Sequence, residues 1–318
     1  MIRYINNPII TRDQIPDIYP HLIDVTSVFN PGAIRHKERI KLMLRVQNRA
    51  RETFFLMAES NNGINFKIEE NLIEWQGLDG LNKRIYHIYD PRITLIDNRF
   101  YIMFAMDLDC GCRLGLGVTS DFKKFDFWGI VSETDNRNGV LFPERIDGKY
   151  LRLDRPNKIQ IENGPLTGNQ ICLSESDDLL NWHPRKILAT GRKHHWDELV
   201  GAGPPPLKTK EGWLIIYHGI ALHYQPIYQA GVMLLDLDEP SHLLARGNQN
   251  ILEPRELYET VGQVPNVVFP TGLIAEKIDQ QGFVESDSDI KLYYGAADNS
   301  VCLAVGKCRE LLAACRVK

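Results

Sequence analysis

Polar side chains that could bind a ligand and do acid chemistry recur directly after short runs of aliphatic and aromatic residues. Together they supply carboxylates, guanidinium groups, an imidazole and an amide, the set needed to bind a polyhydroxylated ligand and to donate a proton to it. A sugar is the ligand class that this set favours. Taken singly, each residue has the alternative of being a solvated strand end or half of a buried ion pair. The residues are Asn30, Arg45, Arg49, Asp90, Asp154, Arg155, His218 and Asp298.

Asp90 carries the most specific of these signals, because it stands in the sequence Tyr89-Asp90-Pro91-Arg92. Proline restricts the residue before it towards an extended conformation and fixes the turn that follows. We therefore expect an extended Asp90 whose carboxylate is aimed by the backbone. The alternative is an ordinary turn, since Asp-Pro is a common turn initiator.

The elements that must position these residues follow an internal repeat. A polar turn followed by a strand-like run occurs five times, at residues 38–44, 97–104, 147–153, 211–217 and 288–294. Each copy reads as the second arm of a hairpin. A second phrase, ending in Ser-Asp-like turn residues before a further strand, occurs at 58–66, 118–125 and 173–182, with a diverged copy at 234–240 and a weak one at 304–307.

The spacing of the repeat indicates the fold. Taking Ile40, Phe100, Tyr150, Trp213 and Ile290 as equivalent, the periods are 60, 50, 63 and 77 residues. This predicts an all-β, five-bladed β-propeller of four-stranded blades, with residues 1–318 as a single catalytic domain. A β-sandwich is the alternative, although it gives no reason for repeating the turn chemistry. In a propeller the innermost strands line a central channel, so the polar residues should face it. Only residues 254–259 suggest a turn or two of helix.

Composition excludes several function classes. The 37 basic and 41 acidic residues give a net charge of −4, so no positive field exists to hold nucleic acid. Cys110 and Cys112 are too close for the usual zinc spacing, and neither a metal nor a cofactor is expected. No apolar run approaches the ~20 residues of a membrane span, and the first residues lack a signal-peptide pattern, which predicts a cytoplasmic protein. Aromatic residues in expected loops, Trp75, Trp128 and Tyr224, leave a homo-oligomer open.

Several segments resemble glycoside hydrolase family 130. They include Tyr89-Asp90-Pro91-Arg92-Ile93, Gly201-Ala202-Gly203-Pro204, Tyr217-His218-Gly219 and Tyr293-Tyr294-Gly295-Ala296-Ala297-Asp298, and the likeness extends from about residue 28 to about residue 305. The resemblance implies a five-bladed propeller and either of two activities: inverting phosphorolysis of β-mannosides, or hydrolysis of β-1,2-mannosides. It also implies that Asp90 is the general acid, which protonates the glycosidic oxygen through a hydroxyl of the bound mannose.

The two activities differ in the nucleophile, since phosphate needs fixed cations and water needs a carboxylate base. The resemblance implies a phosphate pocket around residues 45–49, 136–138, 155, 196–201, 218 and 228–229, with Tyr228 in the binding set. Three departures from the phosphorylase pattern stand out: Gln229 replaces a cation, Leu199-Val200 replaces another, and Asn138 replaces an aspartate. Glu198 is a gained carboxylate in the same region.

These departures predict an inverting hydrolase that releases mannose from β-1,2-linked manno-oligosaccharides, with Asp90 as acid and Glu198 as base. Glu198 has the alternative of being a surface residue next to His194 and His195. The second function candidate is an inverting phosphorylase with inorganic phosphate as co-substrate, because Arg45, Arg49, Arg155 and His218 could still hold phosphate. A third candidate is a non-catalytic glycan-binding propeller, since fold alone does not fix function.

Overall fold

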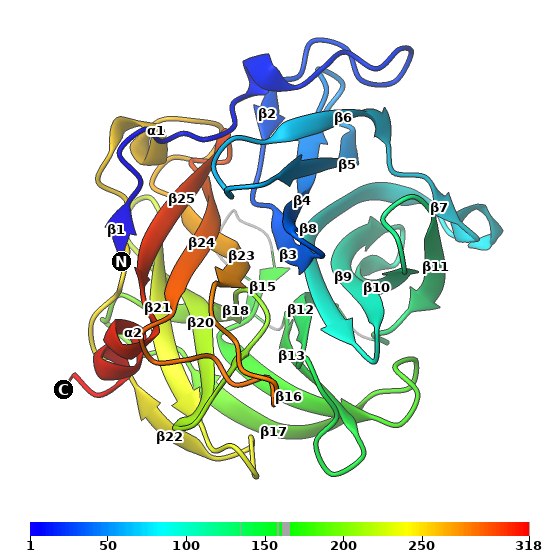
Figure 1. Ribbon diagram of the computed structural model, residues 1–318. Coiled ribbons are helices and arrows are strands. Elements are labelled where there is room, and N and C mark those ends of the chain that lie inside the picture. Colours follow the sequence, from blue (N-terminus) through cyan, green and yellow to red (C-terminus); the bar gives the residue numbers. More distant parts are fainter. Residues whose placement is uncertain (134, 158, 161–165, 318) are drawn as a thin grey trace.

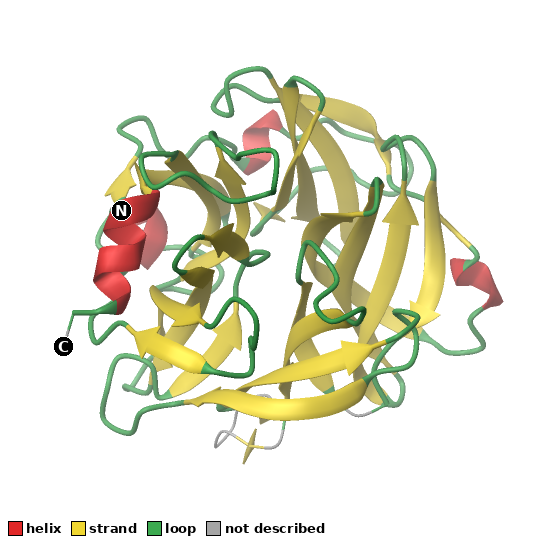
Figure 2. Cartoon of the chain, turned by 60° about the horizontal axis from the view of Figure 1, so that its bottom comes forward, coloured by secondary structure: helices red, strands yellow, loops and turns green. Residues whose placement is uncertain are grey.

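Mostly antiparallel four- and five-stranded sheets are arranged in a ring around a central axis in the computed structural model (Figure 1). The structure describes residues 1–133, 135–157, 159–160 and 166–317, and within this part the chain forms the five blades of a β-propeller. The predicted fold class is therefore confirmed. Figure 2 shows that strands make up the ring and that the helices lie at its periphery.

Each blade runs from an innermost strand at the axis to an outermost strand at the rim. Blade I contains β2 (Ser27–Val28), β3 (Gly32–His36), β4 (Arg39–Gln47), β5 (Thr53–Ser60) and β6 (Lys67–Leu72). Blade II contains β7 (Trp75–Gln76), β8 (Ile85–Ile96), β9 (Arg99–Leu108), β10 (Gly111–Thr119) and β11 (Phe125–Ile130). Blade III contains β12 (Asn136–Leu141), β13 (Tyr150–Pro156), β16 (Gln170–Ser176) and β17 (His183–Thr190).

The chain completes the ring with two further blades and a few peripheral elements. Blade IV contains β18 (Leu199–Ala202), β19 (Leu207–Thr209), β20 (Gly212–Ala221), β21 (Ile227–Leu235) and β22 (Leu243–Arg246). Blade V contains β23 (Val268–Ala275), β24 (Asp289–Ala296), β25 (Ser300–Lys307) and β1 (Ile2–Arg3). Outside the blades lie β14 (Ile159–Gln160), β15 (Leu166–Thr167), α1 (Leu257–Thr260), α2 (Cys308–Cys315) and the 3-10 turns η1 (Arg12–Gln14) and η2 (Leu78–Gly80).

The repeat seen in the sequence corresponds to this architecture. All five residues chosen as equivalent points lie within the first two positions of a second strand, in β4, β9, β13, β20 and β24. The expected turn of helix at residues 254–259 is observed as α1 at Leu257–Thr260. The weak last copy of the second phrase lies in β25, and the chain then enters α2, an eight-residue helix that the sequence pattern did not predict.

The second phrase recurs because one hydrogen-bonded turn is used in successive blades. The hydroxyl oxygens of Ser60, Thr119 and Ser176 each accept a hydrogen bond from the backbone amide three residues later, at 2.9, 3.0 and 2.9 Å. In the diverged copy an aspartate takes the place of the hydroxyl residue. Asp236 Oδ1 accepts hydrogen bonds from the backbone amides two and three residues further on. Such Asx and Ser/Thr turns reverse the chain between the outer strands of a blade.

The core consists of apolar layers between neighbouring blades. One layer packs Met43 and Phe55 of blade I against Ile102 and Phe104 of blade II. Corresponding layers join blades II and III, III and IV, IV and V, and V and I. Because a fully buried Leu, Ile or Phe contributes about 1.5–3 kcal/mol, these layers hold the ring together and leave the axis free for polar side chains.

The N-terminal strand closes the ring. Strand β1 pairs with β25, so blade V combines the first and the last strands of the chain, and both termini lie beside that blade (Figure 1). Arg3 extends this closure, because its guanidinium forms an ion pair with Glu259 of α1 at 2.8 Å. The Glu259 carboxylate is fully buried and also accepts a hydrogen bond of 2.8 Å from the Tyr294 hydroxyl.

Candidate active site in the axial pocket

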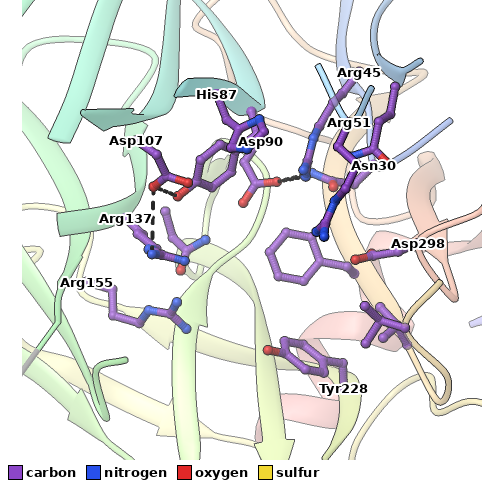
Figure 3. A pocket seen from close by; sticks show the side chains of 16 residues that line it. Asn30, Arg45, Arg51, His87, Asp90, Asp107, Arg137, Arg155, Tyr228 and Asp298 are labelled. Carbon is purple, nitrogen blue, oxygen red and sulfur yellow. Dashed lines mark hydrogen bonds and ion pairs between the residues drawn. The ribbon is translucent and has the colours of Figure 1, made fainter. Parts of the chain in front are cut away.

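A pocket with a volume of about 330 Å³ opens at one end of the propeller axis (Figure 3). We call it the axial pocket. Its described lining is mostly polar and includes four arginines and three aspartates contributed by different blades. The lining residues are Asn30, Arg45, Gln47, Arg51, His87, Tyr89, Asp90, Asp107, Arg137, Asn138, Arg155, Tyr228, Val264, Val267, Phe269 and Asp298.

Asp90 lies on a β-bulge of β8, the innermost strand of blade II. The pairing register with β9 shifts between Tyr89 and Arg92, so that Asp90 and Pro91 are left out of the ladder. Asp90 has a left-handed backbone with φ 56°, which corrects the expectation of an extended residue. Proline suits the bulge because it has no N–H to pair, and the bulge turns the buried Asp90 carboxylate into the pocket. A strained backbone of this kind is common at functional sites.

Asn30, Arg45 and Asp298 surround the Asp90 carboxylate. Asp90 Oδ1 accepts a hydrogen bond from Asn30 Nδ2 at 3.1 Å and lies 3.4 Å from an Arg45 guanidinium nitrogen. Burial raises the pKa of Asp298 to about 6; the Arg45 charge opposes this shift and the nearby Asp90 carboxylate adds to it. Gly295 makes the arrangement possible, since a Cβ there would lie 2.7 Å from the backbone nitrogen of Asn30.

Arg137 and Arg155 form a cationic wall on another side of the pocket, as Figure 3 shows. The Nε atoms of both are buried and have no hydrogen-bond partner in the described structure, and the same is true of Asn138 Oδ1. Buried donors and acceptors are rarely left unpaired in proteins, and because both arginines also line the pocket, this side of it suits a ligand with acceptor atoms. An anion with several oxygens matches guanidinium donors well.

His218 lies behind this wall and does not line the pocket. It is fully buried, and a nitrogen of the Arg155 guanidinium donates to its Nε2 at 3.4 Å. Burial, followed by the charges of Arg155 and Arg92, places the pKa of His218 well below its usual value. The imidazole is therefore neutral and supports Arg155. Gly201 provides the space, because a Cβ there would lie 2.5 Å from the His218 ring.

The structure brings together six of the residues singled out in the sequence and leaves four others, His218 among them, outside the pocket lining. Asn30, Arg45, Asp90, Arg155, Tyr228 and Asp298 line the axial pocket. Asp154 points the opposite way from Arg155, because alternate strand residues face opposite sides, and it pairs with Arg152 at 2.8 Å. Arg49 lies beyond the end of β4, where it pairs with Asp24 at 3.1 Å.

Glu198 also lies outside the axial pocket, which corrects the expected pairing with Asp90. Its carboxylate accepts hydrogen bonds from the backbone amides of Leu222 at 2.8 Å and His194 at 3.1 Å. The Leu222 amide chiefly holds the pKa of Glu198 below its usual range. Glu198 thus serves as a hydrogen-bond acceptor for loop backbone, which agrees better with the alternative of a surface residue than with a catalytic base.

The sequence interpretation missed several lining residues, among them Arg51, His87 and Asp107. Asp107 had a readable signal, because it ends the apolar run of β9 in the way that Arg45 ends that of β4. In blade II the sequence pattern had led only to Asp90. Arg51 and His87 carry no such signal, since they reach the pocket from a turn and from the start of a strand.

Two further properties bear on what the site can do. The described residues contain no group of three or more His, Cys, Asp or Glu side chains placed to hold a metal ion. No helix in the described ranges is long and apolar enough to cross a membrane.

Together, the fold and the pocket define a five-bladed β-propeller with an axial site for a polyhydroxylated or anionic ligand. The chain belongs to glycoside hydrolase family 130: the family model, described as β-1,4-mannooligosaccharide phosphorylase, matches residues 6–317. The expected resemblance is therefore confirmed.

Individual relatives agree with this assignment. A β-1,4-mannooligosaccharide phosphorylase of Ruminococcus albus is 31% identical over 311 residues, covering 95% of this chain and 87% of the relative. A β-1,2-mannobiose phosphorylase of Listeria innocua is 32% identical over 262 residues, covering 82% and 68%. The solved structure of a Listeria innocua β-1,2-mannobiose phosphorylase, in complex with β-1,2-mannobiose, has a TM-score of 0.86 at 27% identity and covers 100% of this chain and 99% of its own.

The expectation of hydrolysis is contradicted by these comparisons. Five curated relatives, 28–32% identical, are all named as phosphorylases. The positions at which a cation is replaced also lie outside the pocket lining. Leu199 and Val200 are buried and are not among the pocket residues, and the Gln229 amide is occupied with Asn250 at 2.8 Å and the Trp196 carbonyl at 3.4 Å. The departures at these positions leave the cations of the pocket in place.

Proposed function

We propose that the protein is an inverting phosphorylase of β-mannosides, which transfers a terminal mannose to inorganic phosphate and releases α-mannose 1-phosphate. The observation that carries the proposal is the pair Arg137 and Arg155, two arginines that line the same side of the pocket (Figure 3). The phosphorylase names of the relatives support the same assignment.

The mannose is expected to lie between the two groups of charged residues. Asn30, Arg45 and Asp298 surround Asp90 and offer both donors and acceptors to sugar hydroxyls. A mannose bound in this way would have its anomeric carbon on the Asp90 side of the pocket. The same arrangement would hold a sugar in a non-catalytic binder, so Asp90 must be tested separately.

Phosphate is expected to bind at Arg137 and Arg155. Two guanidinium groups can bind an anion bidentately and neutralise its charge as it approaches the sugar. Asn138, and Arg155 supported by neutral His218, complete this side of the pocket. Water as nucleophile would instead need a carboxylate base, and Glu198, the base expected from the sequence, lies elsewhere.

The reaction breaks one bond and forms another at the anomeric carbon. A phosphate oxygen attacks that carbon from the face opposite the leaving group, and the bond from the carbon to the glycosidic oxygen breaks. Asp90 supplies the proton that the departing oxygen takes up, directly or through a sugar hydroxyl. One displacement inverts the configuration, so a β-mannoside gives the α-phosphate.

Product analysis tests this proposal. Purified protein is incubated with β-1,2-mannobiose and, separately, β-1,4-mannobiose, each with and without inorganic phosphate, and the products are separated by chromatography. Mannose 1-phosphate and free mannose in equal amounts are expected with phosphate, and no turnover without it. Release of two mannose molecules per disaccharide in phosphate-free buffer would contradict the proposal. Binding of mannobiose with no turnover under either condition would support a glycan-binding propeller.

A further inference from the structure

A fully buried carboxylate lies outside the axial pocket, in helix α1 before blade V. It belongs to Glu259, whose oxygens accept two hydrogen bonds from the Arg3 guanidinium, at 2.8 and 2.9 Å, and one of 2.8 Å from the Tyr294 hydroxyl. The backbone amides of Arg255 and Glu256 donate to the same carboxylate at 2.8 and 3.0 Å. Donors from β1, from β24 and from the segment before α1 thus fix this carboxylate in place.

The Glu259 carboxylate is ionised in this setting. Burial by itself raises its pKa, but the Arg3 guanidinium, the two backbone amides and the Tyr294 hydroxyl together hold the pKa below its usual value. Within the described residues Arg3 is its one ion-pair partner. Removal of the Arg3 charge would therefore leave a buried carboxylate without a counter-ion, which is costly inside a protein.

The backbone of Glu259 connects this cluster to the wall of the axial pocket. We call residues 261–267 the pocket loop, because Val264 and Val267 line the axial pocket. The Glu259 carbonyl accepts a hydrogen bond of 3.0 Å from the backbone amide of Val267. The side chain and the main chain of a single residue therefore link the N-terminal strand to the pocket loop.

The pocket loop in turn supports two residues that face the ligand. Tyr228 donates its backbone amide to the Asn266 carbonyl at 2.9 Å, and Ala297, directly before Asp298, donates to the Val267 carbonyl at 3.1 Å. Tyr228 and Asp298 both line the axial pocket (Figure 3). A displacement of the pocket loop would therefore move the backbone that carries both side chains.

We propose that Glu259 is a positioning residue for the axial pocket and that Arg3 of β1 holds it in place, so that closure of the ring by the N-terminal strand also orders the mannoside side of the pocket. The part of this inference that concerns substrate affinity rests on the proposed function. The cationic wall of Arg137 and Arg155 belongs to blade III, so we expect the phosphate side to be less affected.

Hydrogen exchange tests the link between Arg3 and the pocket loop without any ligand. In Arg3→Met we expect the backbone amides of Tyr228, Val267 and Ala297 to exchange at least about tenfold faster than in the unmodified protein. The strands of blade III should keep their protection. Arg3→Lys keeps a positive charge beside the carboxylate and should retain most of the protection of the pocket loop.

A matched control breaks a similar ion pair elsewhere on blade V. Arg35 pairs with Glu276, which follows the opposite end of β23 from the pocket loop. Arg35→Met should therefore leave the exchange of the pocket-loop amides unchanged. If Arg3→Met does not fold, Tyr294→Phe replaces it in every measurement, because it removes a single hydrogen bond from Glu259, and smaller changes in the same direction are expected.

The kinetics of phosphorolysis test the consequence for the two substrates. Arg3→Met should raise KM for the mannoside roughly tenfold and KM for phosphate by less than about threefold, whereas Arg3→Lys should stay close to the unmodified enzyme. A purely structural role for Arg3 would lower the free energy of unfolding and leave both KM values unchanged.

Equal exchange of the pocket-loop amides in Arg3→Met and Arg35→Met, or loss of protection throughout the ring, would overturn the inference. Mannoside and phosphate KM values that rise together, or that both stay unchanged, would also overturn it. If no substrate is turned over, the proposed function fails, and hydrogen exchange still decides whether Arg3 and Glu259 hold the pocket loop.

Discussion

The guanidinium of Arg92 donates a hydrogen bond of 2.9 Å to the backbone carbonyl of Asp90, two residues earlier in the bulge of β8. Arg92 is buried, and its other nitrogens donate to the carbonyls of Gly203 at 2.8 Å and Ala202 at 3.1 Å. It therefore ties the innermost strand of blade II to that of blade IV. The hydrogen bond from Arg92 to the Asp90 carbonyl therefore stabilises the left-handed backbone that directs the Asp90 carboxylate into the pocket.

Replacing Arg92 should affect stability and activity together. Arg92→Met leaves three buried carbonyls without their donor, so we expect the free energy of unfolding to fall by about 3 kcal/mol or more. Denaturant titration measures this loss. Arg99→Met, on the exposed start of β9, is the control and should change stability by less than about 0.5 kcal/mol. Equal stability of the two variants would show that Arg92 does not hold the bulge.

Asp90→Asn should abolish turnover and leave the sugar bound. Asparagine keeps the size of the side chain but has no carboxyl proton to donate, so kcat should fall by roughly 10²- to 10⁴-fold. Calorimetry with the disaccharide should still detect binding, because Asn30, Arg45 and Asp298 are unchanged. Asp97→Asn, in an exposed turn of the same blade, serves as the control. Near-normal kcat in Asp90→Asn would rule out Asp90 as the acid.

Tyr89 should position the two arginines that bind the two substrates. Its ring lies 5.0 Å from the Arg45 guanidinium and 5.8 Å from that of Arg137, and its hydroxyl donates to Asp107 at 2.8 Å. Loss of the ring in Tyr89→Leu should raise KM for both phosphate and mannoside several-fold, since each cation–π contact contributes about 0.5–2 kcal/mol.

The conservative variant separates positioning from general damage. Tyr89→Phe retains the ring and loses only the hydroxyl contacts with Asp107 and Cys112, so its KM for the mannoside should stay close to that of the unmodified enzyme. Tyr86→Leu is the control, because exposed Tyr86 stacks with Arg84 outside the pocket lining. If Tyr89→Leu changed kcat alone, with both KM values unchanged, the positioning role would be wrong.

Asp298 should make the protein less stable as the pH rises. Because burial raises its pKa to about 6, folded Asp298 keeps a proton between about pH 4 and pH 6 that the unfolded chain has lost. The free energy of unfolding decreases with pH wherever the folded state binds more protons than the unfolded state. Asp298 therefore lowers the free energy of unfolding between about pH 4 and pH 6, and the loss remains above pH 6. Asp298→Asn should therefore raise the free energy of unfolding at pH 7, by up to about 3 kcal/mol.

Denaturant titrations at pH 4, 5, 6 and 7 measure this effect. The unmodified protein should lose stability across the series relative to Asp298→Asn, and Asp147→Asn, in an exposed turn, should follow the unmodified protein. Parallel curves for the unmodified protein and Asp298→Asn would contradict the assigned shift.

Much of the fold could be predicted from the sequence because one blade's local chemistry is repeated. The turn hydroxyls of Ser60, Thr119 and Ser176 and the strands that follow polar turns are local signals, and they recur at blade spacing. Helix α2 was not predicted, because it replaces the last turn after β25 and has no counterpart in the other blades.

The site was less predictable because a strand position does not by itself give a side chain's direction. Asp154 and Arg155 are adjacent, yet only Arg155 lines the pocket. Glu198 and Gln229 lie near the expected phosphate site in the chain, but loop amides and Asn250 occupy their side chains. Arg51 enters the pocket from a turn whose reach depends on the assembled ring.

The central claim is that a phosphate oxygen, and not a water oxygen, attacks the anomeric carbon. The most direct measurement is the cleavage of the β-mannoside in the presence of ¹⁸O-labelled inorganic phosphate, with the products followed by ³¹P NMR and mass spectrometry. The account predicts α-mannose 1-phosphate with ¹⁸O in the bridge between carbon and phosphorus, and free mannose that carries no oxygen from solvent at the cleaved bond. Cleavage of the β-mannoside to free mannose alone, with no mannose 1-phosphate formed, would contradict it.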